Sequence, residues 1–410
     1  SSTLAQIAAA SAPMAPLRNV PCDRKRTETR MRPRASRRRG YPTSMRVLHF
    51  DFDDLDNPWG GGQALRTFEV SRRLATWFGW DITVVTGTYP GARPRQIPVA
   101  NGRLRYVRAG FGQFPWNVLS FTASLPLVAR TLPHDLAVED FTTPVGPSPL
   151  PRVAHRPVIG SAQFLFASEM ARKYRLPFDR AATAFLPNYR HLIALTVHGQ
   201  RTLQASAPGA AVHQIPQGLD RIAFTDPHAI DGTGEHALYL GRLDRDQKGL
   251  DTLLGAWSLM AAAERPPLVI AGDGRDGLAL RREVAHRRLE ASVRFVGRVD
   301  GPAKADLFRR ARLVVMPSRY ETFGIVAAEA MAAGVPLIAS DLPELREVAG
   351  AGARLVPPAD PAALSAAVLS LWIDRDRRVA LGTAGRASVE GLTWDHVAAT
   401  QAAVYISALG

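Results

Sequence analysis

The sequence predicts an α/β fold built from two Rossmann-like, doubly wound domains that face each other across a cleft. The chain has 410 residues, 46% of them hydrophobic, which exceeds one small core and suits two domains of ordinary size. From residue 45 onward, short apolar runs with strand composition alternate with helical patterns. The alternation occurs in both halves of the chain, and successive βα units favour parallel sheets.

In the first half, one strong helical pattern lies between the first two expected strands. The helix is expected from Gln63 to Trp77, because Leu65, Phe68 and Leu74 fall on one face. The expected strands are Val47–Phe50, Asp81–Val85, Leu136–Val138 and Val158–Gly160.

The second half repeats this pattern after a segment rich in turn formers, from Pro216 to Gly234, which is expected to connect the domains. Its expected strands are Ala237–Leu240, Leu268–Ala271, Val293–Val296, Leu313–Met316 and Leu337–Ala339. We predict a tail over 1–44, an N-terminal Rossmann-like domain over 45–222, a C-terminal Rossmann-like domain over 223–390, and a helix over 391–410 that returns to the N-terminal domain.

The net charge of +14 is concentrated near the amino end. Residues 1–44 hold ten basic and two acidic residues, a net charge of +8, which leaves +6 for residues 45–410. A body of that charge favours a protein that handles anionic substrates, and no nucleic-acid partner is expected. Peripheral membrane contact stays open.

Residues 1–44 are rich in Ala, Ser, Pro and Arg and are predicted to be disordered, because they bury too little apolar surface. An arginine-rich targeting peptide is the alternative. Met45 begins a clean strand, so the functional chain is expected to start there and the tail to be dispensable. The single cysteine, Cys22, favours a cytoplasmic protein. No apolar run approaches the ~18 residues that a membrane-spanning helix needs.

The longest motif, PSRYETFGIVAAEAMAAGVP, begins at Pro317. A loop is expected first and then a helix from about Gly324 to Ala333, which the following Gly and Pro end. Glu321 then lies in the loop and Glu329 on the second turn of the helix. The amino end of that helix suits a phosphate, and a carboxylate beside it can accept from two vicinal sugar hydroxyls. Two acids that simply face the positive end of a helix are the alternative.

A second motif, LGRLDRDQKGL, begins at Leu240, so that Arg242 follows a strand and Lys248 precedes a helix. Cations at this place stabilise a departing nucleotide diphosphate, whose negative charge grows as its bond to the sugar breaks. Only four of the 51 basic residues are lysines, so a lysine in this loop indicates a compact ammonium for phosphate. A solvated surface lysine is the alternative.

Together the two motifs resemble those of the family 4 retaining glycosyltransferases, over roughly residues 45 to 400 and most strongly in the C-terminal half. The resemblance implies a GT-B fold, a UDP-, GDP- or dTDP-sugar as donor, no metal, no separate cofactor, and retention of configuration at the sugar. By motif, it implies that Arg242 and Lys248 hold the diphosphate and that Glu321 contacts the transferred sugar.

The resemblance also implies that the backbone N–H groups near Phe323 and Gly324 assist at the sugar and that Glu329 binds the ribose. It places two further loops near the nucleotide base. One holds Gly272 and Gly274, and the other holds Arg298, which acts mainly through its backbone. By themselves these loops are ordinary turns.

In the first domain, WGGGQ begins at Trp59, between the first expected strand and its helix. Gly61 and Gly62 allow close approach of a phosphate, and the helix start supplies N–H donors. The resemblance implies contact with the donor phosphate and the acceptor at this glycine pair. A flexible loop is the alternative.

The sequence departs from the family after the expected strand at 158–160, where many relatives carry a His near the reacting sugar. Here Gln163 occupies the matching position, and an amide binds a hydroxyl but cannot act as a base. Glu139 and Asp140 are expected in a loop after the neighbouring strand, where they would orient or deprotonate the acceptor hydroxyl. A structural capping role for the pair stays equally open.

Two further segments stay ambiguous. The acidic run from Asp51 to Asp56 favours acceptor binding over Mg²⁺, because the basic residues already serve the phosphates. The aromatic run from Phe111 to Phe121 is interpreted as core, with an acceptor wall or a membrane-facing helix as alternatives, and no basic amphipathic helix stands out.

The function predicted on this basis is transfer of a sugar to an acceptor hydroxyl in bacterial antibiotic or cell-envelope glycan biosynthesis. The alternatives are a GT-B epimerase or phosphorylase, and a non-catalytic protein of the same fold that binds nucleotide sugars, nucleic acid or lipid. Intact Arg242, Lys248, Glu321 and Glu329 argue against a non-catalytic protein.

Overall fold

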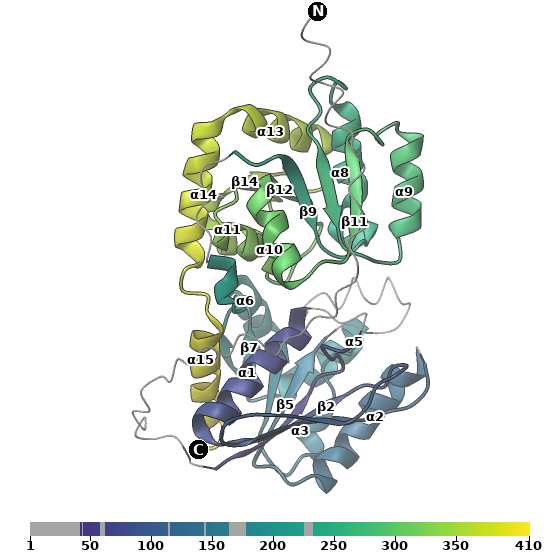
Figure 1. Cartoon of the computed structure of the whole chain (residues 1–410). Helices are drawn as coiled ribbons and strands as arrows, with labels where there is room; N and C mark the ends of the chain where they lie inside the picture. Colours follow the sequence, from purple (N-terminus) through teal and green to yellow (C-terminus); the bar gives the residue numbers. More distant parts are fainter. Residues whose placement is uncertain are drawn as a thin grey trace, which may run out of the picture. The chain divides into compact units, whose positions relative to one another are not determined.

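The computed structural model describes residues 42, 44–57, 62–113, 115–142, 145–163, 178–224 and 233–410. The part from residue 42 onward forms one compact unit with two β-sheets, each flanked by helices (Figure 1). The predicted tail lies outside the described residues except for 42 and 44, as do residues 225–232 of the predicted connection.

The N-terminal sheet has eight strands in the order β3-β4-β2-β1-β5-β6-β7-β8. All of its pairings are parallel except that of β3 with β4. The strands are β1 (Arg46–Phe50), β2 (Asp81–Thr86), β3 (Arg95–Ile97), β4 (Arg103–Arg108), β5 (Leu136–Phe141), β6 (Val158–Ala162), β7 (His191–Ala194) and β8 (Ala211–Gln214). Strands β1 and β5 lie at the centre, which explains why both are almost wholly buried.

Successive side chains of β1 point to opposite faces of the sheet, and different helices cover the two faces. Leu48 and Phe50 belong to the apolar core formed with α2, α3 and α6. His49 lies on the opposite face and pairs with Asp140, which also accepts from the hydroxyl of Thr67 on α1. The helices are α1 (Gly62–Phe78), α2 (Trp116–Thr131), α3 (Leu150–Val153), α5 (Phe178–Phe185) and α6 (Val197–Ser206), followed by the short 3₁₀ turn Arg221–Phe224.

The C-terminal sheet has six parallel strands in the order β11-β10-β9-β12-β13-β14. They are β9 (His236–Leu240), β10 (Leu268–Ala271), β11 (Val293–Gly297), β12 (Ala311–Met316), β13 (Leu337–Ser340) and β14 (Ala353–Val356). The chain order changes direction between β9 and β12, and ligands of open α/β sheets bind outside the carboxyl ends of the strands at such a point.

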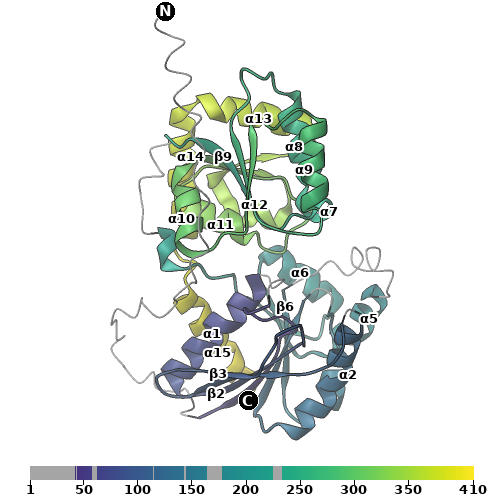
Figure 2. The same ribbon diagram turned by 45° about the vertical axis from the view of Figure 1, so that its right-hand side comes forward.

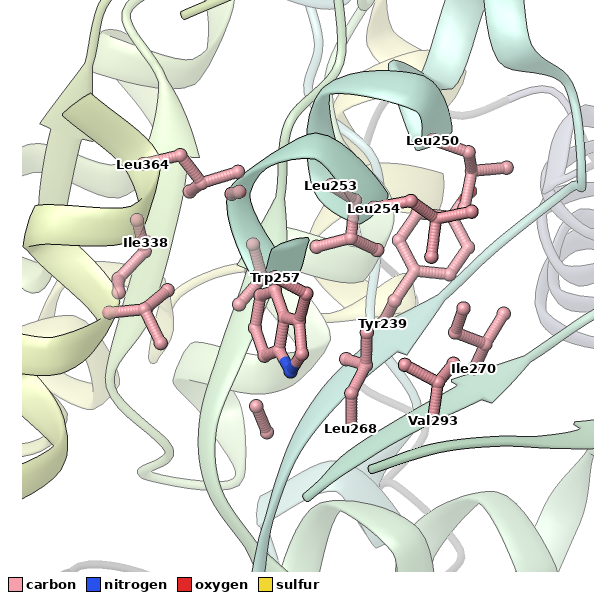
Figure 3. Packing of buried hydrophobic residues seen from close by; sticks show 14 of the residues in the cluster. Tyr239, Leu250, Leu253, Leu254, Trp257, Leu268, Ile270, Val293, Ile338 and Leu364 are labelled. Atoms are coloured by element: carbon pink, nitrogen blue, oxygen red, sulfur yellow. The ribbon is translucent and has the colours of Figure 1, made fainter. Parts of the chain in front are cut away.

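Two separate apolar cores lie on the two faces of this sheet. One is formed with α10 (Gly301–Arg310), α11 (Ile325–Ala332) and α12 (Pro343–Ala349). The other is formed with α8 (Leu250–Leu259), α9 (Gly277–His286) and α13 (Pro361–Ile373). In Figure 3, the Trp257 ring lies next to Leu253 and Leu268, and its indole N–H donates to the Pro266 carbonyl over 3.0 Å. Helices on both faces make this a doubly wound α/β layer.

After α14 (Arg375–Val389), helix α15 (Trp394–Ser407) packs against α1 of the N-terminal sheet (Figure 2). The fully buried guanidinium of Arg66 on α1 donates to the Gln401 side chain over 2.9 Å and to the Pro216 carbonyl over 2.6 Å. One arginine therefore joins α1, the connecting segment and the last helix.

The predicted pair of Rossmann-like α/β layers is confirmed. Five strands were not predicted, namely β3, β4, β7, β8 and β14. Strand β4 alternates arginines with Leu104, Tyr106 and Val107, a half-buried pattern that the search for continuous apolar runs misses. The interpretation of the aromatic run as core is correct for Phe121 but wrong for Phe111 and Trp116, which are 72% and 65% exposed.

Candidate functional site

The loop after β9 is shaped by a short helix, α7 (Arg245–Lys248), with defined caps at both ends. The Asp244 carboxylate accepts from the Gln247 backbone N–H over 3.0 Å, and Gly249 ends the turn with a left-handed φ of +63°. Lys248 is therefore the last residue of a fixed turn at the carboxyl end of a central strand, where the sequence predicted a phosphate-binding cation.

Gly249 also lets this turn touch the loop that follows β12, because a Cβ at position 249 would lie 2.0 Å from the Pro317 carbonyl oxygen. Arg319 fastens the same contact. Its backbone N–H donates to the Gln247 carbonyl over 2.9 Å, and its guanidinium makes a two-pronged ion pair with Asp251, over 2.9 and 2.6 Å. Sequence analysis did not single out Arg319, which positions the two loops of the site relative to each other.

This contact brings Lys248 to Glu321. The Lys248 ammonium lies 2.5 Å from Glu321 Oε1, and the Ser318 hydroxyl donates to the same oxygen over 2.7 Å. Glu321 is only 6% exposed, so its charge depends on these donors. Both bonds use Oε1, and Oε2 has no partner among the residues that the structure describes. One carboxylate oxygen thus stays available to a hydroxyl.

Glu329 on α11 has the same arrangement. The Lys304 ammonium, from the neighbouring α10, lies 2.6 Å from Glu329 Oε1, while Oε2 forms no hydrogen bond or ion pair with any described residue. The described part of this arginine-rich chain contains two lysines, Lys248 and Lys304. Each of them pairs with a glutamate that was predicted to belong to the site. Lys304 was missed, although the rarity of lysine was a signal that could have found it.

Arg242 follows β9 and is exposed. Its carbonyl accepts from the Tyr239 hydroxyl over 2.8 Å, which fixes the backbone. Its guanidinium makes no hydrogen bond or ion pair with a residue that the structure describes. An arginine held at its base, with its charge unpaired at the carboxyl edge of a sheet, is suited to an anionic ligand.

The amino end of α11 is built on Phe323 and Gly324. Phe323 is 4% exposed, and Gly324 has a φ of +84°, where a Cβ would lie 2.5 Å from Leu345 Cδ2. No side chain caps this end of the helix, so its first N–H groups are available to an anion.

The predicted base-side glycines have a structural role in this fold. A Cβ at Gly272, whose φ is +144°, would lie 1.8 Å from the Gly241 carbonyl oxygen, and one at Gly274 would lie 2.5 Å from the Leu243 carbonyl oxygen. The loops after β9 and β10 therefore touch through backbone atoms. Arg298, just after β11, is exposed.

In the first domain, Gly62 is the first residue of α1, on the carboxyl side of β1, whereas Gly61 lies outside the described residues. Gln163 follows β6 and is buried. Its amide nitrogen donates to the Ser161 hydroxyl over 3.0 Å, and its oxygen accepts from Gln217 over 3.3 Å. Gln163 is therefore held in place at the carboxyl end of its strand.

The predicted loop position of Glu139 and Asp140 is wrong. Both belong to β5, which continues to Phe141, and both are at most 2% exposed. They point to opposite faces of the sheet, as alternate strand residues do. Strand β5 includes both acids because each carboxylate has a buried hydrogen-bond partner on its own face of the sheet.

Glu139 accepts a 2.6 Å hydrogen bond from the Tyr189 hydroxyl. Burial nevertheless raises its pKa to about 7. Asp140 pairs with His49 Nε2 over 2.9 Å. The single Thr67 hydroxyl lies within hydrogen-bond distance of both Asp140 and Asp51. Burial, followed by the charge of Asp140, raises the pKa of Asp51 well above its ordinary value.

The acidic run after β1 is largely engaged within the protein. Asp54 is buried and forms ion pairs with Arg95 and Arg108, each over 2.5 Å, and Asp56 also pairs with Arg95. The arginines come from β3 and β4, the two strands that were not expected there. This arrangement fastens the loop after β1 to the edge of the sheet.

Residues 220–388 match the model of a protein family described as glycosyl transferases group 1. Over 227 residues the chain is 38% identical to a phosphatidyl-myo-inositol mannosyltransferase of Mycobacterium tuberculosis, a match that covers 51% of this chain and 58% of that protein. A D-inositol 3-phosphate glycosyltransferase of Jonesia denitrificans is 35% identical over 230 residues, which cover 51% and 54% of the two chains. The chain thus matches little more than half the length of these relatives.

Solved structures resemble nearly the whole described chain. Sucrose-phosphate synthase from Thermosynechococcus elongatus has a TM-score of 0.74 at 23% identity and covers 88% of this chain and 98% of its own. Anabaena HepE, in complex with UDP and glucose, has a TM-score of 0.68 at 17% identity, with 88% and 100% covered. The fold is therefore that of the GT-B glycosyltransferases.

Proposed function

We propose that this protein is a glycosyltransferase that moves a hexose from a nucleoside diphosphate to an acceptor hydroxyl, with retention at the sugar carbon. One observation carries the proposal. Two glutamates near the carboxyl edge of the C-terminal sheet, Glu321 and Glu329, are each held by a lysine through Oε1 and keep Oε2 available. Such carboxylates suit hydroxyl groups, and Arg242 adds an unpaired cation for the diphosphate.

The roles proposed for these residues are the ones that the resemblance of the motifs implies, and the surroundings of each group are compatible with them. Arg242 and Lys248 face the diphosphate, Glu321 accepts from a hydroxyl of the transferred sugar, and Glu329 accepts from the ribose. The partly buried Lys248 ammonium stabilises charge more strongly than a solvated one does. The amino end of α11 contributes N–H donors at Phe323 and Gly324. The loops with Gly272, Gly274 and Arg298 border the base, and Gly61 and Gly62 approach the donor from the first domain.

We propose a front-face displacement. The bond between the sugar carbon and the phosphate oxygen breaks, the acceptor oxygen bonds to the same face of that carbon, and the acceptor proton passes to the departing phosphate oxygen. Because Lys248 and Arg242 meet charge that grows as this bond breaks, they stabilise the transition state more than the bound donor. The positively charged side chains take the place of a metal in this mechanism.

The donor is proposed to be a UDP- or GDP-hexose, since a carboxylate that binds two ribose hydroxyls disfavours a deoxyribose donor such as a dTDP-sugar. The names of the relatives, which specify phosphatidyl-myo-inositol and inositol 3-phosphate, support a polyol hydroxyl as acceptor and a role in cell-envelope synthesis. Gln163 is proposed to bind the sugar or the acceptor through its amide, without acting as a base.

The test has two stages. Thermal unfolding is first followed with UDP, GDP and dTDP and with their hexose conjugates, because a ligand of the folded state raises the melting temperature. The stabilising conjugate is then incubated with myo-inositol derivatives, and release of the nucleoside diphosphate is measured with the anomeric configuration of the product. A chain that no nucleotide stabilises and that turns over no conjugate is not a glycosyltransferase.

A further inference from the structure

Helix α2 is apolar on both of its sides. Val118, Phe121, Leu125 and Ala129 pack into the core of the N-terminal sheet. The opposite side carries a second apolar row at helical spacing, together with one residue of the preceding loop. These exposed residues are Phe111 (72% exposed), Trp116 (65%), Leu119 (51%) and Leu127 (65%). A helix with apolar residues all round is ordinarily buried, whereas no described part of the chain covers this outer row.

The segment that carries this row contains charges of a single sign. The 53 residues from 82 to 134, which include β3, β4 and α2, contain six arginines and no Asp or Glu. Arg95 and Arg108 pair with Asp54. Arg93, Arg103 and Arg130 are exposed and form no ion pair with a described residue. Arg130 continues the exposed row at the last turn of α2.

The row begins at the edge of the sheet where ligand loops lie. Phe111 follows the carboxyl end of β4, and its backbone is fixed to Ser120 of α2. The Phe111 backbone N–H donates to the Ser120 hydroxyl over 2.8 Å, and the Ser120 hydroxyl can donate to the Phe111 carbonyl over 3.0 Å. Two aromatic side chains, Phe111 and Trp116, therefore protrude near the same place.

We propose that this surface, defined as Phe111, Trp116, Leu119, Leu127 and Arg130, binds the face of a bilayer that contains anionic phospholipids. The aromatic and leucine side chains enter the boundary of the acyl chains, and the Arg130 guanidinium meets a headgroup phosphate. A Trp at the rim of such a row suits the interface, where its ring is apolar and its N–H stays hydrated. This inference does not rest on the proposed transfer activity.

The charge distribution favours a bilayer over a second copy of the chain. Two such surfaces placed face to face would each bring the Arg130 guanidinium and no carboxylate, so these charges would repel each other. No helix that the structure describes is long and apolar enough to cross a membrane. Binding would therefore take place on the membrane surface.

Vesicle flotation of the full chain tests the proposal, with vesicles of phosphatidylcholine alone and of phosphatidylcholine mixed with phosphatidylglycerol. The wild type is expected to float with the mixed vesicles. Leu119→Gln with Leu127→Gln should lower partitioning roughly tenfold, and Arg130→Gln should lower binding to the mixed vesicles about fivefold. Leu278→Gln is the matched control, since Leu278 is 75% exposed on α9, and it should bind as the wild type does.

A second readout locates the contact. Phosphatidylcholine with brominated acyl chains, in the mixed vesicles, should quench part of the tryptophan fluorescence of the wild type, and Trp116→Phe should lose that part. The proposal is overturned if the wild type does not float or if Leu278→Gln loses as much binding as the α2 variant. It is equally overturned if the α2 variant changes only the oligomeric state or the capture of a protein partner.

Discussion

At the scale of single residues, the role of Lys248 can be tested directly by substitution. Its ammonium pairs with the Glu321 carboxylate in a partly buried loop. Lys248→Ala should lower kcat by a factor of about 10²–10³ and change the donor KM much less, since the lost charge acts mainly in the transition state. Steady-state rates of diphosphate release check this.

Two controls accompany that measurement. Arg282→Ala, an exposed change on α9, should leave kcat unchanged. The melting temperature of Lys248→Ala separates lost chemistry from lost folding, because Glu321 is left buried without its lysine. A folded Lys248→Ala protein with wild-type kcat contradicts the role given to this residue.

Lys304 is expected to act through Glu329. Lys304→Met should raise the donor KM roughly tenfold while kcat stays near wild type, because the Glu329 carboxylate loses the hydrogen bond that orients it. Discrimination against a 2′-deoxyribose donor should shrink at the same time, and Lys304→Arg should restore part of it. A Lys304→Met variant with unchanged KM and unchanged discrimination would show that the pair only stabilises α10 against α11.

The sequence predicted Lys248, Glu321 and Glu329 because each lies at a fixed distance along the chain from a strand end or a helix start. It could not predict that Lys304 meets Glu329, because that contact depends on how two helices pack side by side. For Glu139, the prediction from the sequence placed the end of a strand too early. A carboxylate in a strand was interpreted as the end of the strand, since its buried partner, Tyr189, lies 50 residues away.

At the scale of elements, the loops at the carboxyl ends of β9 and β10 depend on backbone contact. Gly272→Ala should lower the free energy of unfolding by about 3 kcal/mol or more, because its Cβ would overlap the Gly241 carbonyl and its φ disfavours any side chain. Urea unfolding measures the change.

Gly277→Ala is the matched control for Gly272→Ala. Its Cβ would lie 3.4 Å from the Leu243 side chain, in the first turn of α9, so it should be neutral or slightly stabilising. Equal stability of the two variants would mean that the loops after β9 and β10 can separate without cost.

The central strands of both sheets were predictable because a strand buried on both faces has an almost continuous apolar run, as Leu268–Ala271 does. The strands that escaped prediction are mostly short, polar or near an edge. Strand β3 has only three residues, Arg95–Ile97, and its register depends on the antiparallel partner β4 and not on its own composition.

At the scale of the whole molecule, stability should depend on pH through Glu139. Its pKa is raised from 4.5 to about 7 by burial, so the folded state binds the proton more tightly than the unfolded state does. The contribution is fully present below pH 4.5 and is lost as the pH rises through 7, a change of about 3 kcal/mol in the free energy of unfolding.

Urea unfolding of the wild type and of Glu139→Gln, at several pH values between 4.5 and 8, tests this dependence. The variant should lose the part of the slope that Glu139 contributes and should be the more stable protein at the alkaline end, while Asp51, whose pKa burial also raises, keeps its own contribution. Glu290→Gln, an exposed change, should keep the wild-type slope. Parallel slopes for the wild type and Glu139→Gln would assign the pH dependence to other groups.

The hydrogen bonds of Arg66 to the connecting segment and to the last helix have a practical consequence for expression of the N-terminal sheet alone. Because Gln401 and Pro216 cover this guanidinium and α15 packs against α1, a fragment that stops after the first sheet would lose both hydrogen-bond partners of Arg66 and expose the surface of α1 that α15 now covers. Separate expression of that portion therefore calls for a graft, in which residues 394–407 follow the first sheet through a short artificial tether.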